Sequence, residues 1–376
     1  MNSKEQNIFL TLICFICIVK RKIANFYSFL YEMESKKILI TWGLGYIGSH
    51  TAVLFAQAGY EPILIDNLSN AHKTTVLDGI KEILGYELPF FEGDVRDSEF
   101  LEKLFEEHEF IGVIHFAAKK AVSESCHDPF LYYENNINWT LNLLEVMNTH
   151  KVKNLIFSSS ATVYDIDRNI PPFTETDRLS AINPYGTTKL VTEFLLKDMV
   201  AHKWFSAVSL RYFNPIWAHH SWKLGENPKG IPTNLLPYLL RVAKKEIEKI
   251  SVFGNDYQTP DGTCIRDYIH IEDLAEAHLR SFEWLLEKKQ NSEDEVSFFE
   301  VFNIGTGAGT SVLEMIMMTQ QIIGDEINYE IVDRRDWDVA ISVANASKAK
   351  QILWWEAKKS ILEGIQDAWN FVNKEE

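Results

Sequence analysis

The chain has 376 residues, of which 46% are hydrophobic, and this is enough to bury a large core spread over two compact lobes. The formal net charge of −16 argues against nucleic acid or an anionic membrane surface as a partner, because both are bound by an excess of Lys and Arg. The four cysteines, Cys14, Cys17, Cys126 and Cys264, form neither a disulfide framework nor paired metal-ligand clusters, so we expect a reducing compartment and no metal.

The first 32 residues differ from the rest of the chain. They hold one apolar run, 8–19, which a basic triplet at 20–22 follows. The run is shorter than the roughly 20 residues of a membrane span, and it lacks the clearly positive start and the cleavage site of a signal peptide. Secretion or anchoring stays an alternative, but we expect a cytoplasmic protein without a membrane anchor. In that interpretation Met33 is the true start, and residues 1–32 are an extension outside the fold.

From Lys37 onward, short β-rich runs alternate with helical stretches, which predicts βαβ units and a doubly wound parallel α/β sheet of the Rossmann type. After Phe213 the alternation becomes irregular and rich in turns, which predicts a second, smaller α/β domain. We therefore expect a nucleotide-binding domain at 33–213 and a substrate-binding domain at 214–376. The predicted strands are 37–41, 61–66, 89–92, 112–115, 154–158 and 207–211, and the first predicted helix is 47–58.

The first predicted strand leads into the glycine-rich segment 43–48 (GLGYIG), which opens the first helix. Backbone N–H groups in such a turn, together with the helix N-terminus, are suited to bind a pyrophosphate. Asp66 closes the next strand eighteen residues after Gly48. A carboxylate there accepts hydrogen bonds from an adenosine ribose and repels a 2′-phosphate. The pattern favours NAD over NADP, although the glycines alone would also fit a plain strand-to-helix turn.

Two further motifs carry hydroxyl groups and a lysine. Residues 158–164 (SSSATVY) follow a predicted buried strand, at the sheet edge where such folds bind ligands. Tyr185 and Lys189 stand four residues apart at the start of a helical segment, so the phenol and the ammonium share one face. A nearby cation lowers the pKa of a tyrosine and makes it a usable base. Alone, this pair is also typical of a solvated helix face, but the two preceding motifs favour catalysis.

Together these motifs resemble the extended short-chain dehydrogenase/reductase family and, within it, the UDP-glucose 4-epimerases. The resemblance extends from about Lys37 to Phe371. It implies NAD as a tightly held cofactor, a UDP-hexose as substrate and a homodimer. Its most specific segments are 45–50 (GYIGSH), 156–164, 183–190, 211–215 (RYFNP), 254–257 (GNDY) and 266–270 (RDYIH).

The same resemblance implies roles for individual residues. The catalytic residues are Tyr185 as the base, Lys189, Ser160 and Thr162. The NAD-binding residues are Gly43, Gly45, Tyr46, Ile47, Gly48, Asp66, Asn67, Leu68, Ser69, Asn70, Ala71, Asp94, Val95, Phe116, Ala117, Ala118, Lys119, Lys120, Asn135, Lys189 and Phe213. The substrate-binding residues are Ser160, Tyr185, Asn214, Asn234, Leu235, Phe253, Arg266, Arg335, Asp338 and Ser342.

The implied reaction is a transient oxidation of the sugar at C4. Tyr185 takes the proton of the 4-hydroxyl, to which Ser160 hydrogen-bonds, while hydride passes to the nicotinamide. The keto sugar then turns over in the pocket, and hydride returns to its opposite face. Ser342 stands where some of these enzymes place a tyrosine over the 2-substituent of the hexose. We therefore expect UDP-GlcNAc and UDP-GalNAc to be accepted as well.

Two other interpretations compete with this one. The 4,6-dehydratases of the same fold carry an Asp-Glu pair after the strand-end hydroxyls, and here Ala161 and Thr162 occupy that place. The second alternative is a catalytically inactive homologue that only binds a nucleotide sugar. It arises because Trp42 stands at the first glycine of the family's turn, where an indole would crowd the pyrophosphate.

Tryptophan replaces glycine repeatedly with respect to the family pattern. The chain holds only 18 glycines in 376 residues, about 4.8%, whereas the usual average is roughly 7%. Random drift should not select tryptophan six times. Our hypothesis is that the source organism reads UGA as glycine and that these codons were translated as tryptophan, which would restore an ordinary cofactor turn. The six positions are Trp42, Trp139, Trp217, Trp222, Trp337 and Trp354.

Overall fold

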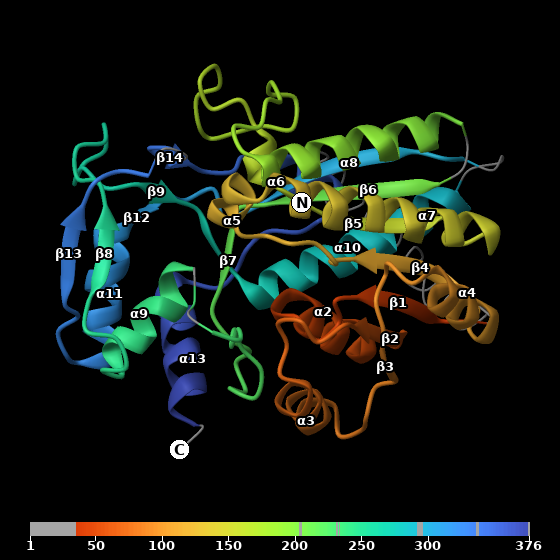
Figure 1. The fold of residues 1–376 in the computed structure, drawn as a ribbon, viewed down its shortest axis with the longest axis horizontal. Helices are drawn as coiled ribbons and strands as arrows, with labels where there is room; N and C mark the ends of the chain where they lie inside the picture. Colours follow the sequence, from red (N-terminus) through yellow and green to blue (C-terminus); the bar gives the residue numbers. More distant parts are fainter. Residues whose placement is uncertain are drawn as a thin grey trace, which may run out of the picture. The chain divides into compact units, whose positions relative to one another are not determined.

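The computed structural model describes residues 35–202, 205–230, 232, 234–291, 296–335 and 338–374. The predicted extension at 1–32 and the glycine-type position Trp337 lie outside these described residues. Lys37–Glu376 forms one compact unit, which contains the fold and the candidate site (Figure 1). In the described part of the chain, no helix combines the length and the apolar character needed to cross a membrane.

The main sheet has seven strands, all parallel, in the order β11-β6-β5-β4-β1-β2-β3 (Figure 1). The chain builds outward from β1 in both directions, which confirms the doubly wound Rossmann-type fold. The switch in strand order lies between β1 and β4, and ligands of such sheets bind outside the carboxyl ends of the strands there. The strands are β1 (Lys37–Thr41), β2 (Glu61–Asp66), β3 (Phe90–Glu92), β4 (Phe110–His115), β5 (Asn154–Ser160), β6 (Ser206–Tyr212) and β11 (Phe299–Ile304).

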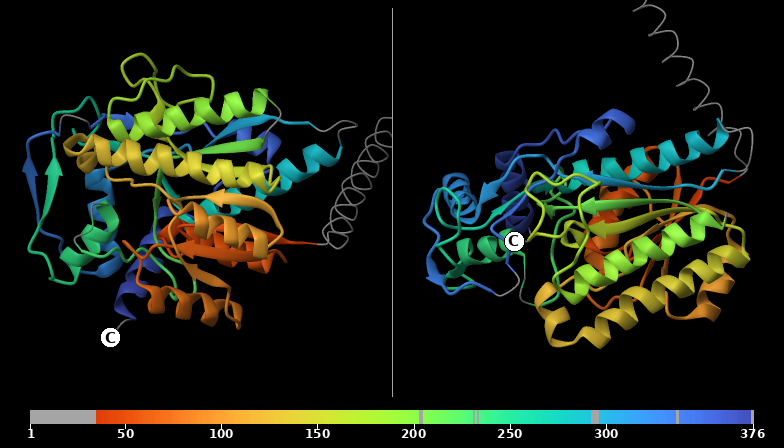
Figure 2. Two further views of the ribbon diagram at one scale, coloured as in Figure 1. Left: turned by 45° about the vertical axis from the view of Figure 1, so that its right-hand side comes forward. Right: turned by 90° about the horizontal axis from the view of Figure 1, so that it is seen from above.

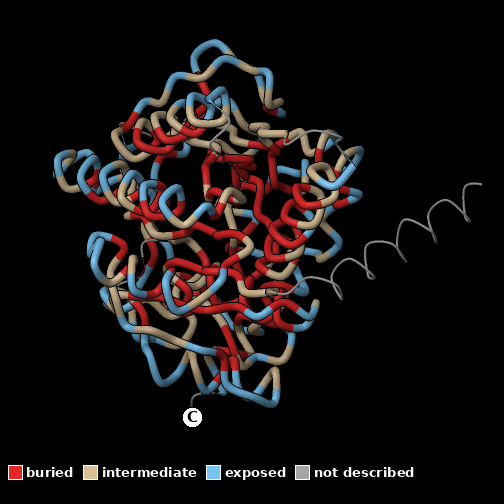
Figure 3. Tube along the Cα trace, turned by 90° about the vertical axis from the view of Figure 1, so that its right-hand side faces the viewer, coloured by how far each residue is buried: buried red, intermediate tan, exposed pale blue. Residues whose placement is uncertain are grey.

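Helices cover both faces of this sheet (Figure 2). On one face, Leu39 of β1 joins a core cluster with Leu104 of α4 (Ser98–Glu107), Leu143 of α7 (Trp139–Thr149) and residues of α8 (Pro184–Ala201). On the other face, α2 (Tyr46–Gln57) packs against α10 (Ile271–Gln290), where the rings of Phe55 and Phe282 have centroids 5.8 Å apart. Because side chains alternate along a strand, an apolar run of five residues serves both faces. Figure 3 shows that the buried residues gather at the centre of the fold.

The first domain also contains shorter elements that connect its strands. Among them, η1 is a π-helix, a rare geometry that interrupts an α-helix and is frequent at functional sites. The connecting elements are α3 (Lys73–Leu84), α5 (Val122–His127), α6 (Pro129–Tyr133), η1 (Glu134–Asn138) and the 3-10 turn η2 (Ala161–Val163).

The C-terminal part is a smaller α/β arrangement with its own core, in agreement with the prediction. Trp217, Leu236, Tyr268, Met315 and Ile365 form the centre of one of its hydrophobic clusters. Its strands pair as β7 (Asn214–Ile216) with β10 (Tyr268–His270), as β8 (Ile250–Phe253) with β13 (Tyr329–Val332), and as β12 (Thr310–Ser311), β9 (Ile265–Arg266) and β14 (Ile341–Ser342). Its helices are α9 (Leu235–Ala243), α11 (Val312–Ile323), α12 (Ser347–Ile352) and α13 (Ile361–Asn373).

The chain does not pass from one part to the other at a single point. After β7 it enters the smaller part, then returns to supply α10 and β11 to the main sheet, and then leaves again. β11 pairs with β6 over its whole length, from Phe299 opposite Ala207 to Ile304 opposite Tyr212. A single boundary at 213 therefore does not separate the two parts of the structure, because residues beyond 214 complete the main sheet. The roles assigned to the two domains stay predictions.

Candidate active site

A cavity of about 660 Å³ opens at the carboxyl ends of the strands, between the main sheet and the smaller C-terminal part. All four predicted catalytic residues and all ten predicted substrate residues line it, although they come from segments as far apart as Ser160 and Ser342. The predicted cofactor residues that also line it are Gly45, Tyr46, Ile47, Gly48, Asn70, Ala71, Phe116, Ala118, Lys120, Lys189 and Phe213.

Local sequence explains where the catalytic helix begins. Pro184 occupies the first turn of α8, where its missing N–H is no loss, and the Asn183 side chain accepts a hydrogen bond of 2.8 Å from the N–H of Gly186. The helix thus starts immediately before Tyr185 and places Lys189 one turn further on. The Lys189 Nζ atom lies 5.9 Å from the centroid of the Tyr185 ring, as the four-residue spacing predicts.

The electrostatics of this pair differ from the prediction. Burial raises the pKa of Tyr185, and a hydrogen bond with Ser160 offsets only part of the effect. Burial also lowers the pKa of Lys189 to about 7, while its Nζ donates a hydrogen bond of 2.6 Å to the Ser158 carbonyl. The expected lowering of the tyrosine pKa by the lysine is therefore not present in this structure. The reason is that burial favours the uncharged form of each group, which raises the pKa of the phenol and lowers that of the ammonium.

The strand-end hydroxyls form a short hydrogen-bonded chain. Ser160 ends β5, and its Oγ accepts hydrogen bonds from the Thr162 backbone N–H at 3.2 Å and from the Thr162 hydroxyl at 3.0 Å. The Ser160 side chain also acts on Tyr185, because it offsets part of the rise in the pKa of the phenol. The three hydroxyl groups thus meet at one wall of the cavity, which suits them to bind and deprotonate a substrate hydroxyl.

A buried ion pair supports this wall from behind, and sequence reasoning missed it. Arg211 of β6 donates to both carboxylate oxygens of Glu193 on α8, at 3.0 and 2.6 Å, and both side chains are about 3% exposed. Glu193 also accepts a 2.5 Å hydrogen bond from Ser159. Burial alone would lower the pKa of Arg211, but its contacts with Glu193 raise it above the usual value. The pair therefore joins α8 to the ends of β5 and β6.

The glycine-rich turn has the geometry that a pyrophosphate site requires. A Cβ atom on Gly48 would lie 2.3 Å from the Trp42 carbonyl oxygen, so only glycine allows this approach. Helix α2 begins after Gly45, which supplies no side-chain cap to the N–H groups of the first turn. These N–H groups and the positive end of the helix dipole are suited to bind an anion.

Asp66 stabilises the glycine-rich turn and does not line the cavity. It is 2% exposed, and its carboxylate accepts hydrogen bonds from the N–H groups of Leu44 at 3.1 Å and Leu68 at 2.8 Å. Burial raises its pKa, and these hydrogen bonds act in the opposite direction. Asp66 thus joins the loops after β1 and β2, and its predicted contact with a ribose stays a prediction. The predicted cofactor residues that do not line the cavity are Gly43, Asp66, Asn67, Leu68, Ser69, Asp94, Val95, Ala117, Lys119 and Asn135.

The opposite wall supplies positive charge. Arg266 is held by donating hydrogen bonds to the Ile265 carbonyl at 2.9 Å and the Val339 carbonyl at 2.7 Å. Arg335 stacks over the Phe253 ring at 4.3 Å and forms two hydrogen bonds with Asp338, at 2.7 and 3.0 Å. Two guanidinium groups in one cavity suit a diphosphate, which accepts paired hydrogen bonds from such planar donors.

Glu226 is a second residue that the sequence did not reveal. It lines the cavity, and one of its carboxylate oxygens accepts hydrogen bonds from Asn234 at 2.6 Å and Lys120 at 3.2 Å. Its other oxygen is buried and has no hydrogen-bond partner among the described residues. The sequence around Glu226 indicates only a turn. Its contacts with Lys120, a predicted cofactor residue, and Asn234, a predicted substrate residue, arise only in the folded chain.

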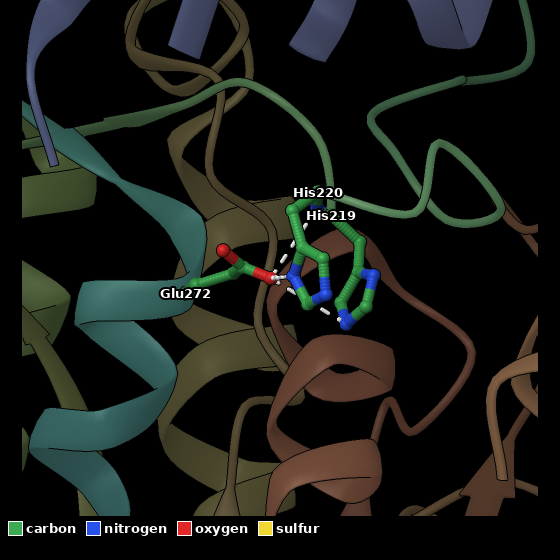
Figure 4. Close-up of side chains that lie close together, drawn as sticks. All are labelled: His219, His220 and Glu272. Carbon is green, nitrogen blue, oxygen red and sulfur yellow. Dashed lines mark hydrogen bonds and ion pairs between the residues drawn. The ribbon is translucent and has the colours of Figure 1, made fainter. Parts of the chain in front are cut away.

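His219, His220 and Glu272 form a cluster of side chains (Figure 4), and none of the three is among the residues that line the cavity. Glu272 accepts a hydrogen bond from His220, and His219 Nε2 lies 3.4 Å from the same oxygen. Burial would raise the pKa of Glu272, but the hydrogen bond from His220 and the nearby imidazoles hold it at about 2. These atoms lie within 4.8 Å of one another and have metal-ligand chemistry. The interactions among them tie the loop after β7 to the first turn of α10, so we assign the cluster a structural role.

Comparison with known proteins gives one consistent family. Residues 39–368 match a model of the GDP-mannose 4,6 dehydratase family. The UDP-glucose 4-epimerase of Bacillus subtilis is 47% identical over 335 residues, which cover 89% of this chain and 96% of that protein. The structure of the Stenotrophomonas maltophila UDP-glucose 4-epimerase, with bound NAD and formylated UDP-arabinopyranose, is similar with a TM-score of 0.85 and 40% identity, over 90% of this chain and 98% of that one. The Bifidobacterium longum enzyme, in complex with NAD+ and UDP, gives 0.83 and 43% over the same shares.

Fold and site thus define a Rossmann-type protein with a serine, tyrosine and lysine site at the carboxyl ends of its strands. The chain belongs to the extended short-chain dehydrogenase/reductase family, in the group of the UDP-glucose 4-epimerases.

Proposed function

We propose that this chain is an NAD-dependent UDP-glucose 4-epimerase, an isomerase that interconverts UDP-glucose and UDP-galactose. The observation that carries the proposal is the shared cavity. It joins the hydroxyls of Ser160, Thr162 and Tyr185 to the glycine-rich turn on one side and to Arg266 and Arg335 on the other. The hydroxyls suit the deprotonation of a substrate hydroxyl, the glycine-rich turn suits a dinucleotide, and the two arginines suit a diphosphate.

The glycine-rich turn and the start of α2 fit NAD, with one exception. The uncapped N-terminus of α2 suits its pyrophosphate, and the close approach at Gly48 leaves backbone N–H groups accessible. Bound NAD would supply a reversible hydride acceptor for the sugar C4. The exception is Trp42, whose side chain lines the same cavity beside Gly45. The fit is therefore good for the turn as a whole and poor for the residue at position 42.

The proposed mechanism assigns the proton to Tyr185. Ser160, positioned by Thr162, accepts or donates a hydrogen bond at the sugar 4-hydroxyl, and Tyr185 removes the proton from that oxygen as C4 is oxidised. When it is protonated, Lys189 places a positive charge 5.9 Å from the centroid of the phenol ring. Arg266 and Arg335 hold the diphosphate while the keto sugar turns over, so that C4 presents its opposite face. Tyr185 then returns the proton, and the product has the inverted configuration.

The name of the matching family model raises the alternative of a 4,6-dehydratase. Dehydration across C5 and C6 requires an acid and a base next to the sugar. Ala161 and Thr162 follow Ser160 on the catalytic wall, so the Asp-Glu pair of the dehydratases is missing from its place. The site favours epimerisation.

The sugar range is a further part of the proposal. Ser342, in β14, lines the cavity together with Arg266 of the neighbouring strand β9. A serine leaves open the space that a tyrosine ring would fill, so we propose that an N-acetyl group at C2 is accepted and that UDP-GlcNAc and UDP-GalNAc are also interconverted.

The assembly and the location are proposals too. We propose a homodimer, supported by large exposed apolar side chains on α6, α7 and α8: Phe130 is 87% exposed, Phe194 53% and Leu141 38%. Sedimentation velocity tests this assembly, and a single monomeric species would contradict it.

We propose a cytoplasmic location, because Cys126 and Cys264, the cysteines within the described residues, are both free and Cys126 is exposed.

The direct test of the proposed function is conversion of UDP-galactose, without added NAD, by the protein purified from its own source, followed by chromatographic separation of the two sugars. The proposal predicts an equilibrium mixture with UDP-glucose. Binding of UDP-galactose without conversion would instead support the inactive binding homologue. Formation of a 4-keto-6-deoxy sugar would support the dehydratase.

A further inference from the structure

Four tryptophans have a backbone conformation that favours glycine. The φ angle is 55° at Trp42, 90° at Trp217, 59° at Trp222 and 54° at Trp354. Residues with a Cβ rarely adopt positive φ, because the Cβ approaches the following carbonyl oxygen, and the usual exceptions are Asn, Asp and His. Among the described residues, the other non-glycine residues with positive φ are Leu68, Lys151 and Lys245.

The concentration in one residue type is the informative feature. The chain has ten tryptophans, and Trp204 and Trp337 lie outside the described residues, which leaves eight. Half of these eight have positive φ, against three of all the other non-glycine residues described. A bulky aromatic side chain is poorly suited to this conformation, so backbone and residue type conflict at four separate places.

The adjacent pair Trp354 and Trp355 gives the clearest contrast. Trp355 is 1% exposed, and its indole N–H donates a hydrogen bond of 2.9 Å to the Asp273 carbonyl. Trp354 is 81% exposed and stands directly after Leu353, the C-cap of helix α12. This position adopts the left-handed conformation in many helix ends and is usually glycine. Trp355 behaves as a tryptophan, and its neighbour occupies a glycine position.

Trp217 is packed in the C-terminal core, but its indole N–H is left without a hydrogen bond in the described part of the chain. Its Nε1 has no hydrogen-bond partner among the described residues, whereas buried tryptophans normally find one. Its ring also takes the place of a side chain on α13, because a Cβ on Gly364 would lie 2.0 Å from the Trp217 ring. Trp222, in the same loop, is 41% exposed. The Trp222 Nε1 donates a hydrogen bond of 3.1 Å to Asp367 on α13, but the ring stays partly exposed at a position whose backbone conformation favours glycine.

At Trp42 the conflict between a left-handed backbone and a tryptophan side chain lies within the candidate cofactor site. Its carbonyl oxygen accepts a hydrogen bond of 3.0 Å from Gly45 and lies against Gly48, so the backbone path of the turn is tightly determined. Its ring lines the cavity within reach of the anion-binding end of α2. Without this ring, the same backbone would leave the turn open to a pyrophosphate.

We propose that the protein made by the cell carries glycine at positions 42, 217, 222 and 354, because these codons are UGA and are read there as glycine. The conformational criterion separates these four from the other four tryptophans within the described residues. Trp355 and Trp284 are true tryptophans, and the Trp284 ring packs edge-on against Phe298 and Phe302 at 5.3 and 5.5 Å. Trp139 has a helical φ of −66°, so its backbone makes no demand for glycine and its case depends on the family resemblance alone.

The first experiment reads the codons and the protein together. The gene sequence is expected to show UGA at the four positions and UGG at 284 and 355. Peptide mass spectrometry of the protein from its own source is expected to show glycine at 42, 217, 222 and 354. Tryptophan in these peptides, or UGG at these codons, overturns the proposal. This result is independent of whether the protein is an epimerase.

A second experiment tests the conformational argument in recombinant protein that carries tryptophan at every position. Trp354→Gly is expected to raise the melting temperature by about 2 °C, because an exposed ring is lost and a left-handed position is relieved. The matched control is Trp355→Gly, one residue further on, which is expected to lower the melting temperature. A fall with Trp354→Gly similar to the control overturns the argument, since it would show that the ring stabilises the fold.

Discussion

Lys189 Nζ lies 5.9 Å from the Tyr185 ring centroid, one turn along α8, and at the same time donates a 2.6 Å hydrogen bond to the Ser158 carbonyl at the end of β5. The lysine thus connects the proposed base to the strand that carries Ser160. Burial lowers the pKa of this lysine and raises that of the tyrosine, so in this structure both groups are shifted toward their uncharged forms.

Removal of the phenolic hydroxyl tests the assigned base. We expect Tyr185→Phe to lower kcat at least about a hundredfold, since general base catalysis contributes roughly 10²–10⁴. NAD content should be unchanged, because the ring itself is retained. Steady-state kinetics and absorbance of released cofactor measure both quantities. Near-normal turnover would reject the role of Tyr185.

The role of Lys189 is tested by the pH profile. Lys189→Met keeps the length of the side chain but removes its charge, so phenolate formation should become harder. We expect the rising limb of kcat against pH to move about 1–3 pH units higher, the effect of one neighbouring charge. Lys189→Arg is the control and should keep most of the original profile. A lower kcat with an unmoved profile would indicate loss of structure and not of charge.

The open volume at Ser342 is tested by filling it. We expect Ser342→Tyr to abolish conversion of UDP-GlcNAc while keeping that of UDP-galactose within about tenfold, because a filled pocket rejects the larger sugar and an open one tolerates the smaller. Ser342→Ala is the matched control and should accept both sugars. A wild-type protein inert toward UDP-GlcNAc would contradict the proposed range.

Trp42 is tested through the cofactor. If its ring blocks the pyrophosphate position, recombinant protein with Trp42 should bind NAD weakly, and Trp42→Gly should purify with more cofactor and convert UDP-galactose faster. NAD released by acid precipitation measures the content. Equal NAD content in the two proteins would show that the ring leaves the site open.

Buried histidines make stability depend on pH. Burial lowers the pKa of His50 and His115 to about 3 and that of His278 to about 4, and for His115 the charge of Lys189 is a smaller part of the cause. The unfolded chain takes up these protons near the usual 6.5 and the folded protein does not, so the free energy of unfolding should fall as pH drops from about 6.5 toward 4. Each group contributes up to about 1.4 kcal/mol per pH unit.

Urea unfolding between pH 7.5 and 4.5 measures this effect, and His50→Gln should reduce the slope. Buried carboxylates act in the opposite direction near the acid end, because burial raises the pKa of Asp66, Asp267 and Asp273. A free energy of unfolding that stays constant from pH 6.5 to 5 would show that the histidines are protonated in the folded protein.

Much of the fold follows from local sequence pattern. β1 and β2 have the predicted bounds, because parallel strands covered on both faces are continuous apolar runs. β5 and β6 extend beyond the prediction to Ser160 and Tyr212, which pair with each other. The polar residues at these strand ends interrupt the apolar pattern, so tertiary pairing and not composition sets where the strands end.

The candidate site shows the same limit. Tyr185 and Lys189 are near in sequence, and their relation is visible in it. The ion pair of Glu193 and Arg211 and the link from Glu226 to Lys120 and Asn234 join segments that only the folded chain brings together. The left-handed φ values at the tryptophans are likewise a property of backbone conformation that sequence pattern alone does not supply.

The most direct test of the account is to follow the hydrogen at C4 of UDP-galactose labelled there with deuterium. If Tyr185 handles only the hydroxyl proton and C4 is oxidised and reduced within one closed cavity, the UDP-glucose formed in ordinary water should keep deuterium at C4 in full, with inverted configuration. Mass spectrometry and proton NMR of the product measure this retention. Loss of the label to solvent would contradict transient oxidation at C4 by a resident cofactor, and with it the proposed reaction.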